Sequence, residues 1–224
     1  ALPARSRVLV LGCGAGREAF ALEAMGHAVT GADISREMLK AAKRHGAMRR
    51  SSVTWVWMPD PLKVPLADAS FDAVVAFAQL LSHIPGADAR VALLAEVRRV
   101  LRGRGIFVAS FTTRRAMREF TGEAKESPGD GARIRGEIKS ASTGAAPDDA
   151  ELAPVWEVGD IFVWDPSDAE LDEPLFFHLH SDEEIRSEAE AAGLVLVDLV
   201  DPRRITDRPE WDAHRYPFLI ARAP

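Results

Sequence analysis

The chain has 224 residues, of which 47% are hydrophobic and 28% are charged, and its net charge is −6. This composition and length suit one large α/β domain. The negative net charge argues against nucleic acid and anionic membranes as partners. One cysteine excludes an internal disulfide, and the sequence has no C-x-x-C pair typical of structural zinc. The longest apolar runs are of strand length, so the sequence predicts no membrane span and no signal peptide.

The first predicted strand, Val8–Leu11, leads directly into the glycine turn Gly12–Gly16. Four consecutive aliphatic residues are typical of a central parallel strand covered on both faces. Glycines at every second position let the backbone turn sharply and approach a ligand closely. A helix beginning near Arg17 would direct its N–H groups and its positive dipole end at the turn. This stretch therefore predicts a nucleotide-binding turn at the edge of an α/β sheet.

The next hundred or so residues predict strands that alternate with helices, as in a doubly wound parallel sheet. Gly26 and Gly103 stand just past predicted helix ends, and Ser35 can cap a helix. The predicted helices are Glu18–Met25, one between Ser35 and Gly46, and Ala87–Leu101, and the predicted strands are Ala28–Ala32, Val53–Trp57, Phe71–Phe77 and Ile106–Phe111.

Residues 112–175 interrupt this alternation, and we interpret them as an insertion or lid within a single domain spanning residues 1–224. Their low content of apolar side chains would make a poor independent core. Within the insertion, Gly159-Asp160 lies between two short apolar runs and predicts a two-residue hairpin. Only six or so residues precede the first predicted strand, so we expect the insertion to cover the ligand site, alone or with a second subunit.

The C-terminal part predicts one more helix and two more strands. Ser181 to Glu184 form a capping box for a helix that ends at Gly193. The two predicted strands are Leu194–Val200 and Tyr216–Ala221. Before the helix, His178 and His180 alternate and would share one face; without a third ligand at suitable spacing, we interpret them as structural rather than as metal ligands.

The spacing of the glycines narrows the choice of nucleotide. A P-loop requires G-x-x-x-x-G-K-[ST], and the sequence does not contain it. The dinucleotide fingerprint requires glycine at the sixth place for close helix–strand packing. Here the sixth place is Arg17, whose side chain would crowd that packing.

Two carboxylates follow predicted strands at the ligand-facing edge. Asp33 stands at the end of the second strand, where it can accept the hydroxyls of a ribose, and this suits NAD and adenosine equally. Asp60 follows the third strand, where it can accept from an exocyclic amine such as adenine N6. The alternative is that Asp33 only caps the helix at Ser35 and that Asp60 only stabilises a turn.

Four blocks, in this order and spacing, resemble the class I S-adenosylmethionine-dependent methyltransferases over roughly Arg7 to Ser110: VLVLGCGAG, VTGADISREML, DPLKVPLADASFDAVVAF and EVRRVLRGRGIFVAS. The segment HSDEEIRSEAEAAGLVLVDL resembles the sixth strand of that family and its preceding helix. The resemblance implies a Rossmann-like, seven-stranded, mostly parallel sheet of order 3-2-1-4-5-7-6, with strand 7 antiparallel. It also implies an enzyme that uses S-adenosyl-L-methionine and releases S-adenosylhomocysteine. Because the sequence predicts no membrane span and no signal peptide, we expect this enzyme to be cytoplasmic.

The resemblance further implies roles for individual residues. Asp33 would hold the ribose hydroxyls, Ile34 would pack on the adenine, and Asp60 would bind adenine N6. Pro61 has no N–H to offer adenine N1, so the Leu62 amide or a water would have to replace it. The implied cofactor-binding residues are Gly12, Cys13, Gly14, Gly16, Asp33, Ile34, Asp60, Pro61 and Phe77.

Methyl transfer from a sulfonium depends mainly on aligning the nucleophile, methyl group and sulfur in a dry site. A base is needed only where the nucleophile must lose a proton. His83, which follows the fourth strand, is the candidate base or cofactor contact; the alternative is a histidine bonded to a backbone carbonyl. The stretch FAQLLSHIP resembles a loop of glycine N-methyltransferase-like small-molecule enzymes. We expect N- or O-methylation of a small molecule, by a monomer or homodimer.

Other side chains offer weaker candidates for acceptor binding. An aromatic group in the insertion could form a hydrophobic wall, and an arginine group after the fifth strand could meet an acceptor carboxylate. Packing and a solvated helix face are the respective alternatives. The two groups are Trp156, Phe162 and Trp164, and Arg114, Arg115 and Arg118.

Two other functions remain open from the sequence. A nicotinamide-dependent oxidoreductase would use the glycine turn and Asp33, but it requires the sixth-place glycine and gives Asp60 no role. A non-catalytic cofactor-binding protein on the same scaffold would fit a site in which Pro61 has replaced an N–H donor.

Overall fold

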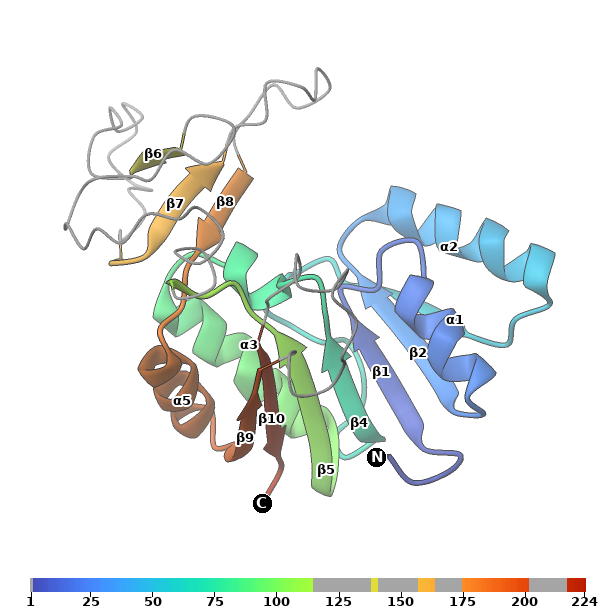
Figure 1. Ribbon diagram of the computed structural model, residues 1–224. Helices are drawn as coiled ribbons and strands as arrows, with labels where there is room; N and C mark the ends of the chain where they lie inside the picture. Colours follow the sequence, from blue (N-terminus) through green and yellow to red (C-terminus); the bar gives the residue numbers. More distant parts are fainter. Residues whose placement is uncertain (1, 115–137, 141–156, 164–174, 202–216) are drawn as a thin grey trace.

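The computed structural model describes residues 2–114, 138–140, 157–163, 175–201 and 217–224, with only the backbone described at 138–140, 161–163 and 175. Seven strands form one sheet of order β3-β2-β1-β4-β5-β10-β9 (Figure 1). The strands are β1 (Arg7–Leu11), β2 (Ala28–Asp33), β3 (Thr54–Trp57), β4 (Phe71–Ala76), β5 (Leu101–Ser110), β9 (Val195–Val200) and β10 (Phe218–Arg222).

The order of these seven strands confirms the predicted topology. Numbered within this sheet, β9 and β10 are the sixth and seventh strands, so the order is 3-2-1-4-5-7-6. The five strands before them pair in parallel, whereas β10 pairs antiparallel with both β5 and β9. The fold is therefore the predicted mostly parallel, doubly wound sheet with one antiparallel strand.

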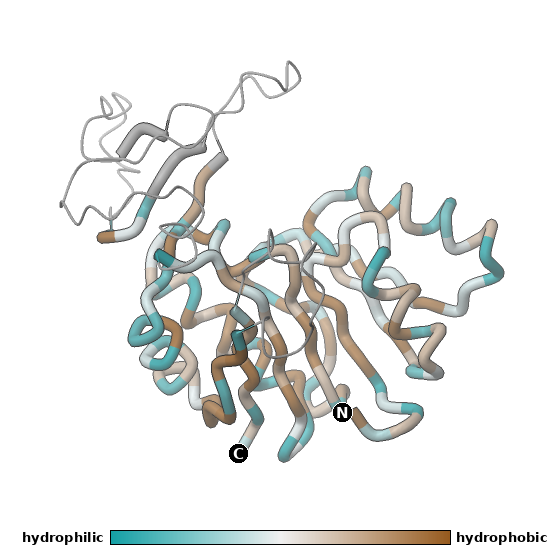
Figure 2. The backbone as a smooth tube through the Cα atoms, in the orientation of Figure 1, coloured by the Kyte–Doolittle hydropathy of each residue, from teal (hydrophilic) through white to brown (hydrophobic). Residues whose placement is uncertain are grey.

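Helices cover both faces of this sheet, which explains the continuous apolar runs in the central strands. The helices α1 (Arg17–Ala24) and α2 (Arg36–Arg49) cover one face, and α3 (Ala87–Val100) and α5 (Asp182–Ala191) cover the other (Figure 1). Hydrophobic colouring follows the central strands between the helix layers (Figure 2).

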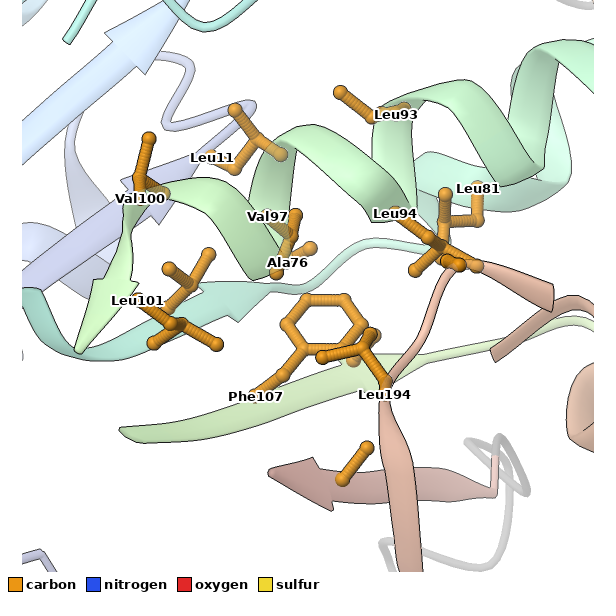
Figure 3. Packing of buried hydrophobic residues seen from close by; sticks show 14 of the residues in the cluster. Leu11, Ala76, Leu81, Leu93, Leu94, Val97, Val100, Leu101, Phe107 and Leu194 are labelled. Carbon is orange, nitrogen blue, oxygen red and sulfur yellow. The ribbon is translucent and has the colours of Figure 1, made fainter. Parts of the chain in front are cut away.

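Alternate residues of β1 belong to two different hydrophobic clusters. Val8 and Val10 pack with residues of α1 and α2, whereas Leu9 and Leu11 pack in the cluster that contains α3 and α5 residues. In the second cluster, Val97 of α3 lies close to residues of β4 and β5 (Figure 3). Each central strand is thus buried on both sides, as its sequence predicts.

Side-chain caps set the beginnings of two helices. The Ser35 hydroxyl accepts from the Met38 amide at 3.2 Å, which confirms the predicted cap of α2. At α5, Ser181 and Glu184 form both hydrogen bonds of the predicted capping box. The expected end of α2 at Gly46 is wrong, because the helix continues to Arg49. Gly46 is a buried residue within the helix, and an added Cβ there would make only an ordinary contact with Phe20 at 3.6 Å.

A second, three-stranded sheet stands beyond the carboxyl ends of the parallel strands, next to η1 (Leu80–His83) (Figure 1). Its order is β6-β7-β8, formed by Ile138–Ser140, Asp160–Val163 and Leu175–His178, all antiparallel. The described residues of 112–175 thus form part of this sheet. The interpretation of 112–175 as an insertion within one domain stays a prediction.

The predicted hairpin at Gly159-Asp160 is wrong. Residues 157–159 form a turn, and β7 begins at Asp160 and pairs with β8 and β6. The Asp160 carboxylate accepts from the Glu157 amide at 2.9 Å and from the His178 ring at 2.7 Å. Asp160 therefore closes the turn and anchors β8, instead of reversing the chain between two adjacent strands.

Among the helices in the described part of the chain, none is long and apolar enough to span a bilayer.

Candidate functional site

The glycine turn after β1 adopts backbone conformations that favour glycine. Gly12, Gly14 and Gly16 have φ values of 66°, 50° and 96°. Around Gly14 an added Cβ would meet nothing within 4 Å, whereas at Gly12 it would lie 3.0 Å from the Leu80 side chain. Leu80 therefore packs over the turn from η1, at the place where a ligand would approach the backbone.

Several amides of this turn are already bonded within the protein. The Cys13 amide donates to the Ala32 carbonyl at 3.0 Å, and the Gly16 amide donates to the Cys13 carbonyl at 2.9 Å. The Gly14 amide donates to Asp33 Oδ2 at 2.7 Å. These hydrogen bonds hold the turn in place. Because the three N–H groups are already bonded, the turn would let a ligand approach the backbone closely rather than donate these hydrogen bonds to it.

Asp33 links the glycine turn to the next helix. It ends β2, is 8% exposed, and accepts from the Gly14 amide through Oδ2 and from the Ser35 amide through Oδ1 at 2.8 Å. Asp33 therefore supports the start of α2, as the alternative interpretation expected, and it also borders a pocket. Its predicted role toward a ribose stays a prediction. Each carboxylate oxygen can accept a further hydrogen bond.

A pocket of about 530 Å³ opens beside Gly12 and Asp33. The loops after β2 and β3 contribute Ile34, Met58 and Pro61, and the opposite wall comes from η1 and α3. The lining residues from that wall are Leu80, His83, Ile84, Pro85, Ala89 and Leu93. The lining is mainly apolar with a polar group at each side, which is the usual character of a small-molecule site.

Asp60 is not brought into this pocket. Its Oδ1 accepts from the Leu62 amide at 2.9 Å, and its Oδ2 lies 3.9 Å from Lys63 Nζ. The carboxylate is therefore turned into its own loop, as the alternative interpretation expected. Pro61 does line the pocket, and the Leu62 amide that could replace its missing N–H is engaged by Asp60.

Cys13 and Phe77 face the core on the α1/α2 side of the sheet. Cys13 is 2% exposed, and burial, with a smaller contribution from Asp33, raises the pKa of its thiol to about 12. Phe77 packs against the same cluster and meets the Phe218 ring edge-on, with ring centroids 5.9 Å apart. The structure thus places these two predicted cofactor contacts outside the pocket lining.

Arg17 does not crowd the helix packing. Its side chain is 84% exposed and pairs with Glu18, so the predicted clash at the sixth place of the glycine motif is wrong. The arginine at this position therefore does not by itself exclude a dinucleotide.

His83 lines the pocket and meets the expectation of a carbonyl-bonded histidine as well. Its Nδ1 lies 3.1 Å from the Phe176 carbonyl oxygen, which requires the proton on Nδ1. Nε2 is then the unprotonated nitrogen. Burial lowers the pKa of His83, and the hydrogen bond to Phe176 opposes that shift. The ring is consequently held as a neutral imidazole, the form that can accept a proton.

His178 and His180 lie in a buried polar cluster behind the pocket wall. Glu157, Asp160 and His178 bring one ligand-type atom each within 4.8 Å of one another. However, His178 bonds directly to Asp160, and Arg90 Nη2 lies 2.8 Å from Glu157 Oε2. The guanidinium already supplies the positive charge that a cation would bring, which favours the structural interpretation.

Arg114 belongs to the same region and is internally bonded. Its guanidinium donates to the carbonyls of Leu179 and Val158 and to Glu184, so its role is to join segments of the protein. The other predicted acceptor contacts, Arg115, Arg118, Trp156, Trp164 and the Phe162 side chain, lie outside the described residues.

The segment that contains this site is similar to known methyltransferases. A family profile described as a methyltransferase domain matches residues 9–109, which include the glycine turn, Asp33 and the η1 wall. The Bacillus subtilis (strain 168) protein named "Putative methyltransferase YqeM" is 32% identical over 107 residues. That match covers 48% of this chain and 42% of YqeM. Residues 9–109 therefore match a methyltransferase domain, and the relatives support a class I S-adenosylmethionine-dependent methyltransferase.

Solved structures agree with this family in fold. The S-adenosylmethionine-dependent methyltransferase of Methanosarcina mazei is 19% identical with a TM-score of 0.67, over 99% of this chain and 93% of that chain. The CcbJ methyltransferase of Streptomyces caelestis is 22% identical with a TM-score of 0.68, over 99% and 85%. The chain therefore shares its fold with these two methyltransferases.

The pocket also contains residues that were not predicted to line it. Leu80 belongs to the stretch FAQLLSHIP and lies in η1, and its position over Gly12 follows only from the chain's tertiary path. Ala89 and Leu93 are spaced by four residues on α3, a helical spacing that could have indicated a shared face. The helical pattern shows that such a face exists but not that it borders a ligand pocket.

Proposed function

We propose that this chain is an S-adenosylmethionine-dependent methyltransferase that methylates a nitrogen or oxygen of a small molecule. The observation that carries the proposal is the joint placement of Gly12 and Asp33 at one side of the 530 Å³ pocket, inside the segment that matches a methyltransferase domain. The small-molecule acceptor is supported by the volume and the mainly apolar lining of that pocket.

In the proposed complex, the adenosine part of the cofactor occupies the pocket. Asp33 accepts the ribose hydroxyls with the lone pairs that the Gly14 and Ser35 amides leave open. Ile34, which is 58% exposed, supplies an apolar surface for the adenine. The methionine part then lies over Gly12. The Leu80 side chain, which packs over Gly12, must move aside to admit it.

His83 is the proposed general base for acceptors that must lose a proton. The Phe176 carbonyl orients the ring with Nε2 as the acceptor. Because burial lowers the pKa of His83, the ring is neutral near pH 7 and can take a proton from a hydroxyl or ammonium group. Acceptors with an unprotonated nucleophile do not need this residue.

Isothermal titration calorimetry with S-adenosylmethionine, S-adenosylhomocysteine and NAD tests the proposal. We expect both sulfur-containing nucleosides to bind and NAD to show no heat. Binding of NAD alone would establish the oxidoreductase alternative. A subsequent assay of S-adenosylhomocysteine release against a library of small amines, phenols and carboxylic acids tests catalysis, and binding without turnover of any acceptor would favour the non-catalytic alternative.

A further inference from the structure

The wall of the pocket between His83 and Arg90 is tied to residues far away in the sequence. His83, Ile84, Pro85 and Ala89 from this wall line the pocket. The helix α3 begins after Gly86, which has a φ of 83° and no side chain that could cap the helix. The first N–H groups of α3 therefore need an acceptor from elsewhere.

Glu157 supplies that acceptor from the base of the insertion. Its Oε1 accepts from the Ala87 amide at 2.8 Å, seventy residues away in the chain. A carboxylate at this position also complements the positive end of the helix dipole. Glu157 thus performs the capping that the sequence of α3 does not provide for itself.

The second oxygen of Glu157 extends the connection into the wall. Glu157 Oε2 accepts from Arg90 Nη2 at 2.8 Å, and Arg90 Nη1 donates to the Ile84 carbonyl at 3.2 Å. Arg90 is 1% exposed and is held at its other side by Glu188 of α5. Because a buried guanidinium with three partners cannot shift freely, it fixes the Ile84 carbonyl relative to α3 and α5.

The other end of the wall is attached to the insertion by a separate contact. His83 Nδ1 bonds to the Phe176 carbonyl, and the His83 ring lies 4.3 Å from the Phe177 ring, centroid to centroid. Both aromatic residues belong to β8. The wall is therefore held at His83, Ile84 and Ala87 by contacts that lead to residues 157–160 and 175–178.

We propose that Glu157 and Arg90 are positioning residues for this pocket wall, so that the base of the insertion is part of the binding site rather than only a cover above it. The inference rests on the proposed function and deepens it, because it assigns the placement of His83 and Ile84 to the insertion. By thermodynamic reciprocity, a ligand that contacts the wall must stabilise the base of the insertion by the same factor.

The first test measures S-adenosylhomocysteine affinity by calorimetry at 15 °C in variants shown to be folded by circular dichroism. We expect Glu157→Ala to weaken binding about five- to tenfold, in line with the loss of a helix cap of about 1 kcal/mol. Glu157→Gln should weaken binding less, since its amide oxygen can still accept from Ala87. Glu190→Ala, which removes an exposed carboxylate of α5, is the matched control and should change affinity less than about twofold.

The second test uses hydrogen exchange and the His83 ring. In the wild type, a saturating concentration of S-adenosylhomocysteine should slow amide exchange in Leu175–His178, and Glu157→Ala should reduce that protection at the same degree of saturation. The His83 ring signals in a heteronuclear NMR spectrum should also shift in Glu157→Ala and be restored toward wild type in Glu157→Gln. These readouts would not move if Glu157 only stabilised the fold.

Three outcomes would overturn the inference. One is a lower melting temperature of Glu157→Ala with unchanged affinity and unchanged His83 signals. Another, which needs no variant, is a wild type that binds S-adenosylhomocysteine without any added protection in Leu175–His178. A wild type that does not bind S-adenosylhomocysteine at all would instead overturn the proposed function, and this inference with it.

Discussion

At the scale of single residues, Asp33 is a buried carboxylate on which two backbone amides of the site depend. Both of its oxygens accept backbone N–H groups, and the side chain is 8% exposed. In Asp33→Asn, one of these amides would face an NH2 group, leaving a buried donor without an acceptor. We expect a loss of about 1–3 kcal/mol in the free energy of unfolding, together with weaker S-adenosylhomocysteine binding. Urea unfolding and calorimetry measure the two effects.

The exposed Asp198→Asn is the control for the Asp33 substitution, because Asp198 lies on the edge strand β9. It should leave both quantities nearly unchanged. Equal stability of Asp33→Asn and wild type would show that the two amides do not depend on the carboxylate.

Two glycines of the same turn make a matched pair. In Gly16→Ala, the new Cβ would lie 2.7 Å from the Trp55 ring and 2.8 Å from the Phe20 ring, at a φ of 96°. In Gly14→Ala, only the backbone conformation is strained, because nothing lies within 4 Å. We expect Gly14→Ala to cost about 1 kcal/mol and Gly16→Ala to cost about 2–4 kcal/mol in urea unfolding. Equal costs would contradict the packing argument.

His180 makes stability depend on pH. Burial above all, with the nearby charges of His178 and Arg90, lowers its pKa to about 2. Below pH 6.5, His180 is therefore protonated in the unfolded chain but not in the folded chain. The free energy of unfolding consequently decreases as the pH falls. This residue should contribute a loss approaching 1.4 kcal/mol per pH unit between pH 6.5 and 5. In His180→Asn, the free energy of unfolding should depend less on pH in that range. Equal pH dependence in the variant and the wild type would show that His180 is not the group responsible.

At the scale of elements, α3 and α5 are joined by the buried pair of Arg90 and Glu188. Arg90 Nη2 lies 2.6 Å from Glu188 Oε1, and the two side chains are 1% and 7% exposed. Arg90→Met would leave the Glu188 carboxylate buried and unpaired, at a cost of about 3–5 kcal/mol. Arg90→Met combined with Glu188→Leu should cost much less than the sum of the single substitutions. A double-mutant cycle measured by urea unfolding gives the coupling energy between Arg90 and Glu188. Additive effects of the two substitutions would contradict the proposed coupling.

The pair also has an expected pH signature. Burial raises the pKa of Glu188 in spite of the hydrogen bonds from Arg90. Once Arg90 is removed, a protonated Glu188 becomes the less costly form. The penalty of Arg90→Met should therefore be smaller at pH 5 than at pH 8.

Element boundaries followed the sequence where local chemistry decides them. Ser35 and the Ser181–Glu184 capping box begin their helices as predicted, since a cap needs only residues within one turn. The predicted hairpin at Gly159-Asp160 was wrong because the role of Asp160 depends on a distant partner, His178. The predicted helix end at Gly46 was wrong because a glycine within a helix is tolerated, and α2 continues to Arg49.

At the scale of the whole molecule, ligand binding should raise thermal stability. S-adenosylhomocysteine at about 100 times its Kd should add about 2.7 kcal/mol to the free energy of unfolding. For a chain of this length, the melting temperature should rise by about 5–10 °C in differential scanning calorimetry. NAD at the same concentration should produce no shift, and a shift with NAD alone would favour the oxidoreductase alternative.

The candidate site was only partly predictable. Gly12, Asp33, Ile34, Pro61 and His83 do line the pocket, because strand ends of a parallel sheet gather at one edge. Asp60, Cys13 and Phe77 do not, because a side chain's direction depends on what its own loop or sheet face offers it. The Arg90–Glu157 connection was not foreseen, since no local pattern joins residues 67 positions apart.

The sequence alone predicted the alternation of strands and helices and the glycine turn, because hydrophobic periodicity and glycine conformations are local properties that survive into the fold. The strand order was predicted only through the resemblance to a known family. Only the tertiary structure decided that Leu80 covers Gly12, that Asp60 turns away, and that Glu157 caps α3 from seventy residues away. These depend on which buried polar groups find partners, and burial brings those partners together from anywhere in the chain.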